Sequence, residues 1–129
     1  MRYSASVTIE IGKTEDDPHE EYLDVCFGHI TQVSILFPPG HAGLTHLQIF
    51  HQTRQIFPST PGESFVGDDT QHVFAERWPI FEAPHRLMLR AWNDDTENPH
   101  TIYVDISVLV PEILMPVIVQ SPMLPEGMV

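Results

Sequence analysis

Residues 101–109 read Thr-Ile-Tyr-Val-Asp-Ile-Ser-Val-Leu, and this stretch decides the fold class. Its apolar side chains at 102, 104, 106 and 108 alternate with the side chains of Thr101, Tyr103, Asp105 and Ser107. A period of two places alternate side chains on opposite faces of a β-strand, so that one face meets a core and the other meets solvent. The stretch therefore predicts a half-buried strand.

Six further segments carry strand signals. Residues 3–11 alternate as cleanly as residues 101–109, and weaker patterns cover residues 29–37, 45–51, 54–57, 72–78 and 86–92. Turn residues separate these segments, as at Pro38-Pro39-Gly40 and Gly67-Asp68-Asp69. No segment has the periodicity of a helix. Seven strands with turns between them predict an all-β domain, namely a single β-sandwich or jelly roll, with a small closed barrel as the alternative.

Residues 13–24 hold six acidic side chains together with Lys13 and Pro18. We interpret this segment as a solvated loop whose charges keep a nearby sheet edge from pairing with other chains.

The bulk composition excludes several classes of protein. The 129 residues suit one domain, and a net charge of -12 disfavours binding to phosphate backbones, so we expect no nucleic-acid partner. Cys26 is the one cysteine, which excludes an intramolecular disulfide, and its apolar neighbours indicate a buried side chain. No run of apolar residues approaches the ~20 of a membrane-spanning helix, and the N-terminus does not resemble a signal peptide. We expect no membrane association, and a cytoplasmic or virion location.

The C-terminal segment differs from the rest of the chain. We predict a β-sandwich domain over residues 1–110 and an apolar, proline-rich arm over residues 111–129. Ten of the arm's nineteen residues are Ile, Leu, Met or Val, and its four prolines exclude a stable helix. The predicted anchors for a partner subunit are Ile113, Leu114, Val117, Ile118 and Val119. Main-chain pairing to a sheet edge is expected at residues 117–120, either on the arm's own sheet or on a neighbour's.

The chain offers little support for catalysis or for a bound cofactor. Its eight histidines form no His-x-His pair, and we interpret them as scattered surface residues rather than metal ligands. The acidic pairs at 16–17, 68–69 and 94–95 lack the spacing of a calcium loop and suit turns instead. No nucleophile elbow, phosphate-binding loop or Cys-x-x-Cys motif is present. We therefore predict a protein that is not an enzyme and carries no cofactor.

A set of turn motifs carries a resemblance to a known class of proteins. The motifs are Phe37-Pro38-Pro39-Gly40, Gln55-Ile56-Phe57-Pro58, Gly67-Asp68-Asp69, Ala91-Trp92-Asn93 and Pro99-His100-Thr101-Ile102. Over residues 30–110 the chain resembles the small β-sandwich or jelly-roll proteins that decorate or cement phage and virus capsids. The resemblance implies a homo-oligomer, often a trimer, that binds capsid protein in a virion and has no catalytic residues.

The first hypothesis is therefore a non-enzymatic structural protein that assembles on a capsid lattice and on neighbouring subunits. The alternative is a carbohydrate-binding β-sandwich module, with Trp78, Trp92 or Tyr103 as stacking platforms and an optional calcium ion. The second alternative is a small metal-dependent enzyme.

Overall fold

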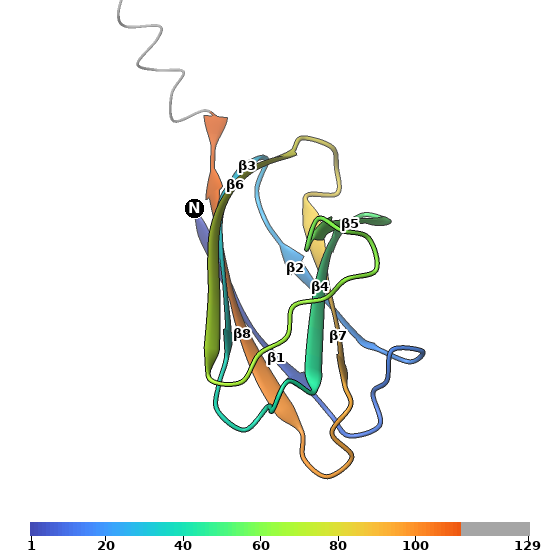
Figure 1. Cartoon of the computed structure of the whole chain (residues 1–129). Coiled ribbons are helices and arrows are strands. Elements are labelled where there is room, and N and C mark those ends of the chain that lie inside the picture. Colours follow the sequence, from blue (N-terminus) through green and yellow to red (C-terminus); the bar gives the residue numbers. More distant parts are fainter. Residues whose placement is uncertain (112–129) are drawn as a thin grey trace, which may run out of the picture.

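The computed structural model describes residues 1–111, which form an all-β sandwich (Figure 1). Eight strands follow one another in the chain: β1 (Arg2–Ile9), β2 (His19–Asp24), β3 (Gly28–Phe37), β4 (Thr45–His51), β5 (Arg54–Phe57), β6 (Thr70–Ile80), β7 (Arg86–Asn93) and β8 (His100–Leu109). Each of the seven predicted strands has a counterpart among these eight.

The strands form two four-stranded antiparallel sheets that face each other (Figure 1). One sheet has the order β1-β8-β3-β6 and the other has the order β2-β7-β4-β5. Every connection crosses from one sheet to the other, except the β4–β5 hairpin, which stays in its own sheet. This order of strands is that of a jelly roll, in which crossing connections wrap the chain around one core.

The core lies between the sheets and is filled by the inward side chains of the alternating strands. In β8, which lies between β1 and β3, the inward residues Ile102, Val104, Ile106 and Val108 are at most 2% exposed. The outward residues of the same strand are partly or largely exposed, among them Tyr103 at 45%. Burial on this scale is the main stabilising contribution, at about 25 cal/mol per Å² of apolar area.

The interpretation of residues 13–24 as a loop was wrong over its second half. His19–Asp24 forms strand β2 and pairs with β7 from His19 opposite Ala91 to Asp24 opposite Arg86. Leu23 turns inward against the core, while Tyr22 and Asp24 face solvent. The acidic residues obscure the alternation of inward and outward side chains in this segment. The pairing with β7 shows that alternation. The predicted protection of a sheet edge by charge is then provided by β2 itself.

The N-terminus lies beside the end of β8 (Figure 1). The Met1 ammonium donates to the carbonyl of Val108, and the Val108 N–H donates to the carbonyl of Met1, both over 2.7 Å. Strand β8 ends at Leu109, close to the predicted boundary between domain and arm. The predicted anchors Ile113, Leu114, Val117, Ile118 and Val119 lie outside the described residues. Within residues 1–111, no helix is long and apolar enough to cross a membrane.

Candidate interaction surface

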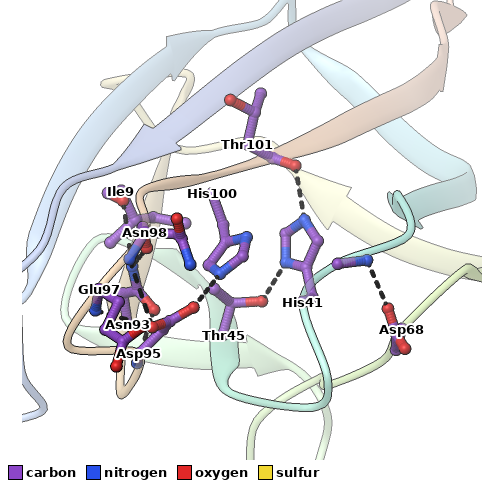
Figure 2. A network of polar contacts seen from close by, with 11 residues as sticks. Ile9, His41, Thr45, Asp68, Asn93, Asp95, Glu97, Asn98, His100 and Thr101 are labelled. Atoms are coloured by element: carbon purple, nitrogen blue, oxygen red, sulfur yellow. Dashed lines mark hydrogen bonds and ion pairs between the residues drawn. The ribbon is translucent and has the colours of Figure 1, made fainter.

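Two histidines and an aspartate form a polar cluster at the end of the sandwich opposite the N-terminus (Figure 2). His41, from the β3–β4 loop, is 2% exposed, and its ring lies 4.5 Å from that of His100 at the start of β8. His100 Nε2 lies 2.8 Å from Oδ2 of Asp95. The interpretation of the histidines as scattered surface residues was therefore wrong for this pair, because crossing loops bring together residues about sixty positions apart.

The cluster binds two loops together and is not accessible to a substrate. His41 Nε2 donates to the carbonyl of Thr101 over 3.0 Å, and Nδ1 forms a hydrogen bond with the hydroxyl of Thr45. Burial, and to a smaller degree the nearby charge of His100, lowers the pKa of His41. A general base must reach the proton that it abstracts, and both nitrogens of His41 are already occupied. We therefore interpret the cluster as structural.

Two of the three acidic pairs, at 68–69 and 94–95, each have one aspartate that accepts a backbone hydrogen bond in a loop. The backbone N–H of Glu97 donates to Asp95 over 2.8 Å and, together with His100, holds the pKa of Asp95 below its usual value. The N–H of Gly40 donates to Asp68 over 2.8 Å, and this contact and the N–H of Ala42 lower the pKa of Asp68. Among residues 1–111, no three His, Cys, Asp or Glu side chains are placed to hold a metal ion together.

The three aromatic residues considered for sugar stacking have different surroundings. Trp92 is 4% exposed because the ring of His46 stacks on it at 4.9 Å, so Trp92 is no platform. The guanidinium of Arg54 lies 4.9 Å from the ring centroid of Trp78, and the two residues line an open depression of about 330 Å³ together with His51, Gln52, Phe81 and Glu82. Tyr103 is exposed on the outer face of its sheet.

Exposed apolar side chains gather at the end of the sandwich where the chain leaves β8. Phe27 and Phe81 stack with their ring centroids 4.9 Å apart, although they are 39% and 47% exposed. His29 contacts Phe81 edge-on at 4.9 Å, and the partner of His29 across the sheet is Leu109, which is 38% exposed. We call Phe27, His29, Phe81 and Leu109 the exit cluster. The predicted arm begins two residues after its last member.

The four sheet edges differ in how well they are protected against pairing with another chain. β2 carries three acidic residues, β5 has only four residues, and β6 contains a bulge at residues 76–77 and a proline at 79. Charge, shortness, bulges and proline are the usual means of blocking an edge strand. β1 has eight residues, a regular register with β8 and a single charged residue, Arg2. It is the unprotected edge among the described strands.

Neither the exit cluster nor the β1 edge was predicted as a site. Phe27 and Phe81 lie in different connections, and no local pattern links residues more than fifty positions apart. A signal for the β1 edge was present, because residues 3–9 lack the charges and prolines that block an edge. That signal becomes useful only when β1 is known to lie at an edge rather than inside a sheet.

No protein-family model matches the chain, and no curated protein or solved structure is significantly similar to it.

Proposed function

We propose that this chain is a non-enzymatic assembly protein that binds neighbouring subunits of a larger protein particle. Decoration or cementing of a virus capsid is its most concrete form, with the virion as its location. The observation that carries the proposal is the exit cluster, where the stacked rings of Phe27 and Phe81 remain 39% and 47% exposed near the end of β8.

Exposing both the two phenyl rings and an apolar arm to water is unfavourable in an isolated subunit. A chain with a net charge of -12 has ample polar surface, yet it exposes two stacked phenyl rings at the end where β8 finishes. The sequence of residues 111–129, which follows β8, carries ten Ile, Leu, Met or Val residues. Contiguous apolar surface of this kind marks interaction sites in soluble proteins. A contact that covers the exit cluster and the arm would remove both from water, and a stable interface needs about 1,200–2,000 Å² in total.

Truncation tests the role of the arm. A chain ending at Val110 should have a lower oligomer mass by light scattering than the full chain and should lose binding to its particle. A chain ending at Ser121 is the matched control, because it keeps all five predicted anchors while losing eight residues. Equal masses and equal particle binding for the two truncations and the full chain would exclude the arm as the assembly element.

The depression beside Trp78 supports a carbohydrate-binding module as a second candidate. Its volume of about 330 Å³ is in the range of small-ligand sites, and Gln52, Arg54 and Glu82 supply polar groups. Arg54 covers one face of the indole, so a sugar would stack on Trp78 only after displacing it. A glycan array should then register binding that is lost in Trp78→Ala and kept in Tyr103→Ala, which lies on an outer sheet face. An array without any bound glycan rejects this candidate.

A further inference from the structure

One edge of β1 has backbone N–H and C=O groups that bond to no other described strand. The pairing of β1 with β8 decides which residues carry these free groups. Met1 and Val108 exchange two backbone hydrogen bonds, and the residues of β1 and β8 then pair in strict alternation. In an antiparallel ladder every second residue bonds to a given neighbour. Tyr3, Ala5, Val7 and Ile9 therefore bond to β8, while the N–H and C=O groups of Arg2, Ser4, Ser6 and Thr8 point away from it.

Within residues 1–111, β1 pairs with β8 and with no other strand. Apart from Arg2, the side chains on its outer face are small, and three of the four already bond to β8: Arg2 and Ser4 to Asp105, and Thr8 to Thr101. On its inner face Tyr3 and Ala5 are only half-buried, whereas Val7 and Ile9 are fully buried. An added strand would satisfy the free backbone groups and would cover the two half-buried side chains.

We propose that β1 pairs with β1 of a second copy of this chain across a twofold axis at Ser6. In this register Ser6 lies opposite Ser6 of the second copy, Ser4 lies opposite Thr8, and Arg2 lies opposite Glu10. The free backbone groups all belong to even-numbered residues, so the three central pairs exchange about six hydrogen bonds. The two sheets join into one continuous sheet of eight strands.

Charge favours a second copy of β1 as the occupant. The charged residues on the exposed face of this segment are Arg2 at one end and Glu10 directly after the other end, and the antiparallel register brings opposite signs together twice. Arg2 already lies 3.4 Å from Asp105 of its own chain, but its side chain is 71% exposed and can contact a second carboxylate. Opposite charges directly across a ladder stabilise the pairing, and like charges oppose it by a similar amount. No like-charge pair arises in this register. An isologous contact of this kind closes at two copies.

The contact extends the proposed function, because it supplies a self-association surface on the side of an assembly protein, but it does not require the arm. The arm is the competing occupant. A segment of 18 residues outside the described structure can span up to about 60 Å, which is enough to reach the β1 edge of the same chain.

Cysteine cross-linking in the full-length chain tests the register, with Cys26→Ser as the background. Residues that exchange hydrogen bonds across an antiparallel ladder have Cα atoms about 5.5 Å apart, which suits a disulfide. Ser6→Cys should form a covalent dimer under mild oxidation. Ser4→Cys alone should not, because the two copies of residue 4 would lie about 14 Å apart along the strand. A mixture of Ser4→Cys and Thr8→Cys should cross-link, with one copy from each variant.

Charge exchange supplies a second measurement that needs no cysteine. Arg2→Glu and Glu10→Arg should each raise the dimer dissociation constant, measured by sedimentation, by about fourfold or more, because each change replaces two opposite-charge pairs by two like-charge pairs. The double variant should restore it. Absence of a Ser6→Cys dimer, or additive effects of the two charge changes, would overturn the proposal. An intramolecular disulfide between Ser6→Cys and Ile118→Cys would assign the edge to the arm instead and would also overturn it.

These outcomes separate this contact from the proposed role of the arm. If Ser6→Cys dimers form while truncation at Val110 leaves assembly unchanged, the edge contact stands and the arm hypothesis fails. If truncation abolishes assembly and no Ser6→Cys dimer forms, the reverse holds.

Discussion

Gly28→Ala is predicted to destabilise the protein strongly, because another backbone segment occupies the space that a side chain would need. A Cβ built on Gly28 would lie 2.3 Å from the carbonyl oxygen of Leu109 and 2.9 Å from Cγ1 of Val108. Real contacts between these atoms lie above about 3 Å, so β8 or β3 must move by most of an ångström. The movement distorts the pairing in which His29 lies opposite Leu109.

The expected loss of stability in Gly28→Ala depends on which atom the new Cβ contacts, here a backbone oxygen. Overpacking of a well-packed site costs about 1–3 kcal/mol, and a backbone oxygen held in a ladder places Gly28→Ala at the upper end of this range. A domain of this length loses about 4 °C in Tm per kcal/mol, so the expected loss is about 12 °C. Gly12→Ala is the matched control, because its φ of 88° is strained for alanine but no atom lies within 4 Å of its Cβ. We expect a loss of about 1–2 kcal/mol there.

The assay is chemical and thermal unfolding of both variants beside the unmodified chain. A loss for Gly28→Ala that is no larger than the loss for Gly12→Ala would refute the reasoning. The double variant Gly28→Ala with Val108→Ala should recover little stability, since the closest contact is the Leu109 oxygen and not the valine methyl group. Full recovery would identify the side chain as the source of the clash.

Three further predictions concern residues in or against the core. The folded protein holds the pKa of His41 below its ordinary value near 6.5, so the unfolded chain takes up a proton at a higher pH than the folded chain does. The free energy of unfolding should therefore fall as the pH drops below about 7, by at most about 1.4 kcal/mol per pH unit. His41→Gln should flatten this dependence between pH 7.5 and 5, where Asp68 and Asp95 stay ionised; an unchanged slope would contradict the assignment. The buried Nε1 of Trp78 has no hydrogen-bond partner among residues 1–111, so Trp78→Phe should leave the free energy of unfolding unchanged or raise it; a loss above about 1 kcal/mol would contradict this expectation. Ile106→Ala should lower the free energy of unfolding by about 2–5 kcal/mol and Ile106→Val by about 0.5–1.5 kcal/mol, because Ile106 is fully buried in a central strand, and equal losses would argue against cavity formation as the cause.

The two proposed contacts lie on different parts of the molecule and use different physics. The exit cluster and the arm rely on removing apolar area from water, which is not directional. The β1 edge relies on backbone hydrogen bonds, which are directional and set a register. A subunit with one contact of each kind can bind a varied apolar surface and still align a second copy of itself.

Local pattern alone predicted most of the strands and their inward faces. Residues 101–109 alternate because one face of the strand meets the apolar core and the other face meets water. This requirement acts between residues only a few positions apart. The same reason accounts for residues 3–9 and for Leu87, Leu89 and Ala91. The two strands at 45–51 and 54–57 were also predicted from neighbouring residues, and they pair as a hairpin that closes over two positions.

The tertiary structure alone decided which strand lies next to which, and with it the candidate surfaces. β2 was not predicted because its acidic residues obscure the alternation until β7 pairs with it. His41 and His100 meet because two loops cross at one end of the sandwich. Nothing in residues 2–9 states that β1 is an edge strand, since that depends on where the other seven strands pack. Periodicity is encoded within one segment, but adjacency depends on the free energy of the whole sandwich, to which every segment contributes.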